Sequence, residues 1–135
     1  MKKNNEFENI KKKLDSLDFL KKENNIYIDK RTDDYSSNFG LQWSEFPKTQ
    51  FDSHTGFPLT KERLLNSSGW SFNELKDKLI IELGSGAGRF TEVLLSSQCY
   101  VVSVEMSSAI NVNALNNKSN KIIFIKSSLN NLSFL

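Results

Sequence analysis

Cysteine and histidine are scarce in this chain of 135 residues, which contains one of each. A single cysteine, Cys99, excludes an internal disulfide and a zinc site built from cysteines. It stands at the head of an expected strand, and we interpret it as a small core residue rather than a nucleophile. His54 lies among turn-forming residues without a second histidine or a cluster of carboxylates. We therefore interpret His54 as a surface residue rather than a general base, and we expect no metal site.

Long apolar runs and a strong excess of either charge are also missing. No run approaches the roughly 20 apolar residues of a membrane span, and no secretory signal is recognisable. The net charge of +2 is too small to indicate a nucleic acid or an anionic membrane as a partner. The hydrophobic content of 38% and charged content of 25% are typical of a soluble globular domain. The expected location is the cytoplasm.

The most informative stretch is Leu79–Leu95, with the sequence LIIELGSGAGRFTEVLL. Its first five residues form a short apolar run rich in β-branched side chains, which predicts a buried strand. Gly84, Gly86 and Gly88 follow at every second position, where they let the backbone turn sharply and approach a ligand. A helix is expected next, with its free N–H groups directed at the loop. The pattern favours a cradle for a nucleotide-like cofactor over a purely structural turn.

The spacing of the glycines indicates which cofactor. A dinucleotide site has the pattern G-x-G-x-x-G, whereas here the third glycine comes one residue early and Arg89 takes its place. The observed pattern is E-x-G-x-G-x-G, beginning at Glu82. It resembles the first motif of class I S-adenosylmethionine-dependent methyltransferases. The resemblance implies that S-adenosylmethionine is the cofactor and that Glu82 lies beside its cationic methionine moiety. The implied loop contacts are Gly84, Ser85, Gly86 and Gly88.

A second strand is predicted at Tyr100–Val104, and Glu105 follows it directly. An acidic residue at this place, about 20 residues after the glycines, accepts hydrogen bonds from both ribose hydroxyls in cofactor-binding folds. A carboxylate at the N-terminus of the next helix is the alternative interpretation. After a glycine loop we favour the ribose contact. Met106 is expected to pack on the adenine.

A third strand is predicted at Lys121–Lys126, followed by the tail SSLNNLSFL. This tail resembles the methyltransferase stretch in which an Asp accepts from the adenine amino group, before a Leu-Pro-Phe turn. Ser128 stands where that Asp is expected, and Ser133 stands where the proline is expected. Because a hydroxyl is a weaker acceptor than a carboxylate, the sequence predicts weaker recognition of adenine.

The first 25 residues carry apolar side chains at steps of three and four, which predicts one amphipathic helix. We favour a helix docked on its own domain over one that binds a membrane surface or a partner. Residues 24–38 are expected to form a loop around the short apolar piece Ile26–Ile28. The stripe consists of Phe7, Ile10, Leu14, Leu17 and Leu20.

Residues 39–65 read FGLQWSEFPKTQFDSHTGFPLTKERLL, and Thr60 is expected to be the N-cap of a short helix. The segment resembles the lead-in to the glycine motif in one group of bacterial class I methyltransferases of small-molecule, lipid or sugar pathways. The resemblance implies that Gln42, Trp43 and Arg63 belong to a lid or bind the methionine carboxylate. The alternative is that Trp43 and the phenylalanines pack against the sheet.

Together these elements predict an α/β fold: the first half of a Rossmann-like, doubly wound parallel sheet with strand order 3-2-1. We expect a helical and irregular N-terminal cap over residues 1–70 and a cofactor-binding β-α-β-α-β half over 71–135. The first strand, Leu79–Leu83, would lie at an edge of the sheet with unpaired backbone groups. We favour a truncated chain as the explanation, and the alternatives are a complementing chain or a second copy that pairs with this strand. The expected chain is therefore an incomplete methyltransferase with little turnover by itself.

The predicted function is transfer of a methyl group from S-adenosylmethionine to an unidentified small-molecule, lipid or sugar acceptor. No catalytic residue is assignable. One alternative is a non-catalytic relic that binds a cofactor or a partner. A second alternative, a nicotinamide-dependent oxidoreductase, is disfavoured by Glu82 and by the early third glycine.

Overall fold

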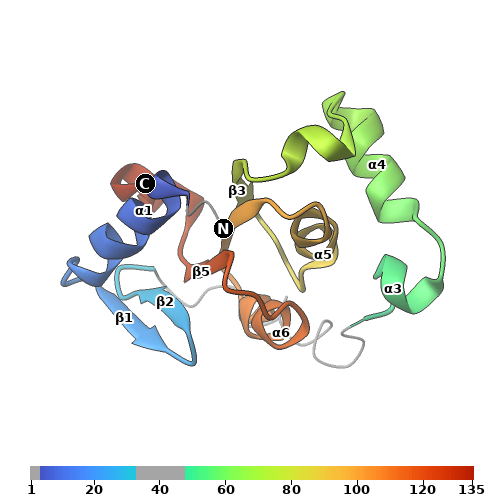
Figure 1. The fold of residues 1–135 in the computed structure, drawn as a ribbon. Coiled ribbons are helices and arrows are strands. Elements are labelled where there is room, and N and C mark those ends of the chain that lie inside the picture. The colour runs from blue at the N-terminus through green and yellow to red at the C-terminus, as the bar shows by residue number, and fades with distance from the viewer. Residues whose placement is uncertain (1–3, 33–47) are drawn as a thin grey trace.

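The computed structural model describes residues 4–32 and 48–135. In this part of the chain a mixed sheet lies between helices, with the two shortest strands and α1 at one end and α3 and α4 at the other (Figure 1). The helices are α1 (Asn5–Asp15), α3 (Asp52–Thr55), α4 (Leu59–Ser68), α5 (Arg89–Ser96) and α6 (Ala109–Asn116), with 3-10 helices η1 (Phe72–Leu75) and η2 (Leu129–Phe134). The strands are β1 (Leu20–Glu23), β2 (Ile26–Asp29), β3 (Leu79–Leu83), β4 (Tyr100–Glu105) and β5 (Ile122–Lys126).

The fold is α/β in class. Its sheet is mostly parallel, with the order β1-β2-β5-β4-β3. The three predicted strands β3, β4 and β5 are parallel neighbours, with Leu83 opposite Val104 and Glu105 opposite Lys126. The prediction of a three-stranded order 3-2-1 is nevertheless wrong for the sheet as a whole, because β2 adds in parallel to β5 and β1 adds antiparallel to β2. The sheet thus takes strands from both sides of the boundary predicted at residue 70.

The missed strands form a hairpin within the segment predicted as a helix and a loop. Helix α1 ends at Asp15 instead of continuing to residue 25, and Leu20 begins β1. The turn is made by Asn24 (φ 47°) and Asn25 (φ 65°). Two consecutive residues with positive φ match the right-handed twist of hairpin strands, and asparagine tolerates this conformation. The Asn-Asn pair was the sequence signal for the hairpin.

Helix α1 forms because its ends are satisfied locally. The Asn4 side chain accepts a hydrogen bond from Phe7 N at 3.1 Å and so acts as the N-cap. Glu6 and Glu8 occupy the first turn, and lysines occupy the last. This arrangement complements the helix dipole. The lysines that interrupt the apolar stripe therefore stabilise α1, because their positive charges lie near its negative C-terminal end.

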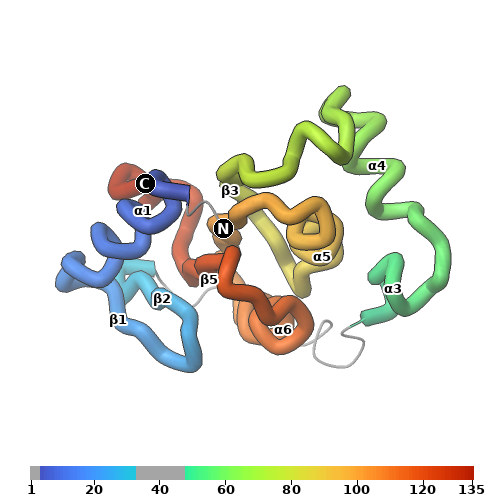
Figure 2. The backbone as a smooth tube through the Cα atoms, in the orientation of Figure 1, coloured from blue at the N-terminus to red at the C-terminus, as the bar shows by residue number. Residues whose placement is uncertain are grey.

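Alternating side chains along β4 divide the core into two layers. Tyr100, Val102 and Val104 face α1 and η2, while Val101 faces α5 and α6. The ring of Phe7 packs on Tyr100 with centroids 5.0 Å apart. Figure 2 shows the C-terminal segment beside α1, where Phe134 joins the same cluster. The N-terminal helix is therefore docked on its own sheet, as favoured from the sequence.

The partly buried side chains that pack on these two clusters come from both the predicted cap and the predicted cofactor half. On the α1 side they include Ile10, Leu17, Leu20 and Leu79.

Cys99 is fully buried and its thiol donates to Leu94 O at 3.1 Å, in agreement with its interpretation as a core residue. Among the described residues, no helix combines the length and apolar character needed to cross a membrane.

Strand β3 lies at the edge of the described sheet, with β4 as its neighbour. Two of its apolar side chains remain exposed, Ile81 at 47% and Leu83 at 55%. The two missed strands, β1 and β2, add at the opposite edge, so they leave the edge at β3 unchanged.

Replacing Phe7 with Ala should destabilise the whole fold if α1 is part of the sheet's core. Truncation of a fully buried aromatic residue costs about 3–5 kcal/mol, and the loss should appear in one cooperative transition. Urea unfolding followed by far-ultraviolet circular dichroism measures this change. Lys11→Ala, on the exposed side of the same helix, is the control and should change stability by less than about 0.5 kcal/mol. Equal stability of both variants would show that α1 does not belong to the cooperative core.

Candidate functional site

The glycine loop follows β3 and is held against the end of β4 by backbone hydrogen bonds. Gly84 N and Ser85 N both donate to Val104 O, at 2.8 Å and 3.2 Å. Gly88 N donates to Ser85 O at 3.1 Å, which closes the turn before α5. Gly84, Gly86 and Gly88 have φ values of 73°, 55° and 94°, a region that only glycine adopts readily.

The three glycines serve two different purposes. A Cβ atom added at Gly84 or Gly86 would meet nothing within 4 Å, so these two residues face open space. A Cβ added at Gly88 would lie 2.1 Å from Asn113 Oδ1 and 2.4 Å from Asn117 Nδ2. Gly88 is therefore required for close packing of α5 against α6, whereas Gly84 and Gly86 leave room for a ligand.

Glu105 lies at this loop. Its Oε2 accepts a hydrogen bond from Gly86 N at 2.9 Å, and its Oε1 accepts one from Ser107 N at 2.8 Å. The carboxylate thus joins the ends of β3 and β4. Each carboxylate oxygen has a second lone pair, so Glu105 retains acceptor capacity.

Glu82 points from β3 toward α5. Its Oε2 accepts a hydrogen bond from the Thr91 hydroxyl at 2.6 Å. Within the described part of the chain, Glu82 Oε1 is buried and has no hydrogen-bond partner. Burial raises the pKa of Glu82 to about 7, more than the hydrogen bond from Thr91 lowers it. The side chain is therefore a largely buried acid whose pKa lies well above that of a solvent-exposed glutamate.

Asn113 of α6 connects the loop, α5 and β4 beneath this site. Its Nδ2 lies within hydrogen-bond distance of the oxygens of Thr91 at 2.9 Å and of Ser85 and Ser103 at 3.2 Å. Asn117 Nδ2 donates to Asn113 Oδ1 at 2.8 Å and to Gly88 O at 2.9 Å. Neither asparagine was predicted from the sequence as a site residue. Their signal was the high density of asparagines in and directly after α6, at Asn111, Asn113, Asn116 and Asn117.

Met106 and Ser128 lie at the same edge of the sheet, after β4 and β5. Met106 is exposed, which leaves its side chain accessible to a ligand. Ser128 is the N-cap of η2, where its hydroxyl accepts from Asn130 N at 3.3 Å and its backbone N–H donates to Thr32 Oγ1 at 3.0 Å. Its hydroxyl therefore already has a structural role.

The lead-in residues are placed only in part. Gln42 and Trp43 lie outside the described residues. Arg63 is exposed on α4. Thr60 is not the N-cap, because α4 begins at Leu59 after Pro58. Asp52 satisfies the free N–H groups instead, accepting from Thr60 N at 2.8 Å and from Lys61 N at 2.9 Å.

The architecture and the loop define an α/β chain whose sheet is consistent with a Rossmann-like fold. No protein-family model matches the sequence, and searches of curated proteins and of solved structures found no match. Among residues 4–32 and 48–135, no group of three or more His, Cys, Asp or Glu side chains is arranged to hold a metal ion.

Replacing Gly88 with Ala should destabilise the chain more than the same change at Gly69. Both glycines have positive φ, but a Cβ at Gly69 meets nothing within 4 Å. Gly69→Ala should therefore cost about 1 kcal/mol from backbone strain alone. Gly88→Ala adds a collision with two buried asparagines and should cost about 3 kcal/mol or more. Urea unfolding measures both, and equal losses would contradict the close packing of α5 on α6.

Glu82→Gln should make the folded chain more stable at high pH but not at low pH. The unfolded chain ionises Glu82 near 4.5, whereas the folded chain does so at about 7. A raised pKa means that the folded state binds the proton more tightly, so stability falls as pH rises from 4.5 to 7. Glutamine does not ionise, so the variant avoids this loss. Its free energy of unfolding should exceed that of the wild type by up to about 3 kcal/mol at pH 8 and by little at pH 4.5.

Urea unfolding at several pH values gives the difference between the two proteins. Glu62→Gln, on exposed α4, controls for the removal of one negative charge. A Glu82→Gln gain that is the same at pH 4.5 and pH 8 would show that Glu82 does not titrate with a raised pKa.

Proposed function

We propose that this chain binds S-adenosylmethionine at the glycine loop and belongs to a methyltransferase for a small-molecule, lipid or sugar acceptor. The observation that carries the proposal is the hydrogen bond from Gly86 N to Glu105 Oε2 at 2.9 Å. It brings the loop and the acidic residue together at the carboxyl ends of β3 and β4. Ligands of open α/β sheets bind at that edge.

The residues present fit such a cofactor. The open space at Gly84 and Gly86 admits a ligand close to the backbone, and the remaining lone pairs of Glu105 suit the vicinal hydroxyls of a ribose. Met106 offers an exposed, polarisable side chain for the adenine face. Ser128 offers only a hydroxyl that already caps η2, so adenine recognition is expected to be weak at this position.

Glu82 supports a cationic ligand through its charge. A buried carboxyl group with a pKa of about 7 becomes fully ionised when a cation lies nearby. S-adenosylmethionine carries an ammonium and a sulfonium group. When bound, it supplies an activated methyl group for in-line transfer to an oxygen, nitrogen or carbon. The chain's own part is to bind and orient the reactants and to exclude water.

A second candidate function is a non-catalytic module that binds a cofactor or a partner. Ser128 favours it, because the carboxylate expected for adenine is replaced by a helix-capping hydroxyl. The unpaired edge at β3 also favours it, since in the described chain no further strand forms a second wall beside the loop.

Glu105→Ala should weaken binding of S-adenosylhomocysteine by about 1–3 kcal/mol, the usual range for hydrogen bonds to a charged partner. Calorimetry measures the affinity of the wild type and the variant. The same titration with the analogue that lacks both ribose hydroxyls isolates the contact. If Glu105 binds the ribose, the substitution should hardly change the already weak affinity of the analogue.

Glu105→Gln controls for the structural role of the carboxylate, because its amide oxygen still accepts from Gly86 N or Ser107 N. An equal loss of affinity for both ligands would exclude Glu105 as the ribose contact. Absence of binding by the wild-type chain would contradict the proposed function itself.

The edge at β3 is proposed to pair with a second copy of the chain. An antiparallel pair centred on Ile81 would place Ile81 of one copy opposite Ile81 of the other and bring the exposed Leu83 side chains into the same interface. Such pairing satisfies the free N–H and C=O groups of an edge strand. It does not complete the site beside the loop, so little turnover is expected in a methylation assay.

Ile81→Lys should convert the chain from a dimer to a monomer, because it places a charge at the centre of the paired strands. Size-exclusion chromatography with light scattering measures the mass. Leu115→Lys, on the exposed side of α6, is the control and should leave the dimer intact. A wild-type monomer that methylates any acceptor would contradict both the pairing and the expected inactivity.

A further inference from the structure

A cavity with polar side chains in its lining lies next to the start of α5, between α3, α4 and the segment that precedes them. Its volume is about 340 Å³, and its lining includes Gln50, Asp52, Thr60, Arg63 and Arg89. We call it the arginine cavity. It is close to the proposed cofactor site in sequence, because Arg89 directly follows Gly88.

The one carboxylate in this lining is already used. Both oxygens of Asp52 accept backbone hydrogen bonds at the N-terminus of α4, from Thr60 N at 2.8 Å and Lys61 N at 2.9 Å. The hydroxyl of Thr60 donates to Gln50 O at 3.3 Å. These groups satisfy one another and build the wall. The negative charge of Asp52 is directed at the helix end rather than paired with an arginine.

Most N–H donors of the Arg63 and Arg89 guanidinium groups are not used in hydrogen bonds with the described residues. Arg89 Nη1 donates to Gln50 Oε1 at 3.3 Å, and the Arg89 guanidinium lies 4.8 Å from the Phe90 ring centre. Within residues 4–32 and 48–135, neither Arg63 nor Arg89 forms an ion pair. Each guanidinium has five N–H donors in a planar fork that suits the oxygens of a carboxylate or phosphate.

We propose that the arginine cavity binds the anionic group of a small molecule, a carboxylate or a phosphate, with Arg63 and Arg89 as its ligands. Two arginines from separate helices line one cavity, and the carboxylate in that lining, Asp52, is engaged by backbone N–H groups of α4. An anion would balance the charge of the arginines and accept bidentate hydrogen bonds from them. The identity of the molecule rests on the proposed function: the anion is either a group of the methyl acceptor or the methionine carboxylate of the cofactor.

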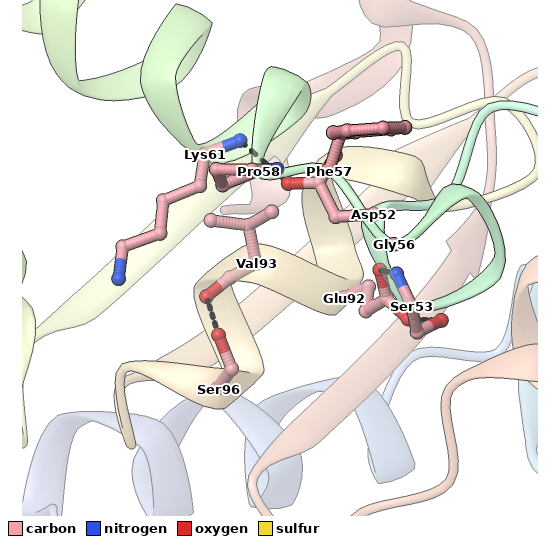
Figure 3. Close-up of a pocket in the computed structure, with 9 residues that line it drawn as sticks. All are labelled: Asp52, Ser53, Gly56, Phe57, Pro58, Lys61, Glu92, Val93 and Ser96. Atoms are coloured by element: carbon pink, nitrogen blue, oxygen red, sulfur yellow. Dashed lines mark hydrogen bonds between the residues drawn. The ribbon is translucent and has the colours of Figure 1, made fainter.

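A neighbouring cation provides a matched control. Lys61 is on the same helix as Arg63 but lines a different cavity of about 500 Å³, with Val93 and Glu92. In Figure 3 the ammonium end of Lys61 points away from Asp52 and Glu92, while Ser53 lies against Glu92. The Lys61 ammonium lies 3.8 Å from the Phe72 ring centre. Lys61→Gln removes the same charge from α4 without reaching the arginine cavity.

The test is a titration of the full chain with inorganic phosphate, followed by nuclear magnetic resonance on the Nε–H signals of Arg63 and Arg89. The expected result is saturable binding that shifts both signals. Arg63→Gln and Arg89→Gln should each weaken phosphate binding about tenfold or more, since each removes charge-assisted hydrogen bonds. Lys61→Gln should change the affinity less than about twofold, because the Lys61 side chain lines the other cavity and its ammonium lies over the Phe72 ring.

No saturation in the wild type would overturn the proposal. Equal weakening by all three variants would also overturn it, because the effect would then be one of net charge alone. The far-ultraviolet circular dichroism spectrum of each variant checks that it is folded. Both arginines are at least partly exposed, so the variants are expected to fold.

Two further titrations assign the anion. S-adenosylhomocysteine carries the methionine carboxylate, and 5′-methylthioadenosine does not. If Arg63→Gln weakens only the former and phosphate competes with it, the cavity holds the methionine carboxylate. If phosphate and S-adenosylhomocysteine bind together, the cavity holds a group of the acceptor. Failure of the wild type to bind either nucleoside would contradict the proposed function but leave the phosphate result in force.

Discussion

The close approach of α5 to α6 at Gly88 is the constraint on which the site depends. Asn113 and Asn117 occupy the space where any larger residue at position 88 would place its Cβ. The same two asparagine side chains form a connected set of hydrogen bonds that joins the loop, α5 and β4. Because buried amides are stable only when their partners are in place, this network holds the loop in one conformation.

The same network explains the unusual state of Glu82. Its carboxyl group shares Thr91 with Asn113, and one of its oxygens remains without a partner in the described chain. Burial then keeps the proton on the acid up to about pH 7. Glu105 lies at the open side of the loop, where its two oxygens accept hydrogen bonds from Gly86 N and Ser107 N. The two acids near the loop therefore have different surroundings: Glu82 is largely buried, and Glu105 is bonded to the backbone of the loop.

Several features of the site were predictable because they depend on local sequence. Alternating glycines with positive φ mark a tight loop, and an acid directly after the next apolar strand lies at the same edge of a parallel sheet. This is why Gly86 and Glu105 lie close together. Asn113 and Asn117 escaped notice because a polar residue in a helix shows no sign of its partners until the helix is packed. The prediction of Thr60 as the N-cap is wrong because the side chain that accepts from the first N–H groups of α4 belongs to Asp52, eight residues earlier in the sequence.

The sequence by itself determined the three parallel strands, their crossover helices and the glycine loop, since each follows from hydrophobic period and backbone preference within about 20 residues. Tertiary structure decided the rest. The hairpin β1–β2 joins the sheet only because β5 offers an edge to Ile26–Ile28. The sequence around Ile26–Ile28 does not reveal this pairing, because β5 is nearly 100 residues further along the chain. Likewise, Arg63 and Arg89 meet in one cavity only after α4 and α5 have packed, because side chains on separate helices are brought together by packing and not by spacing.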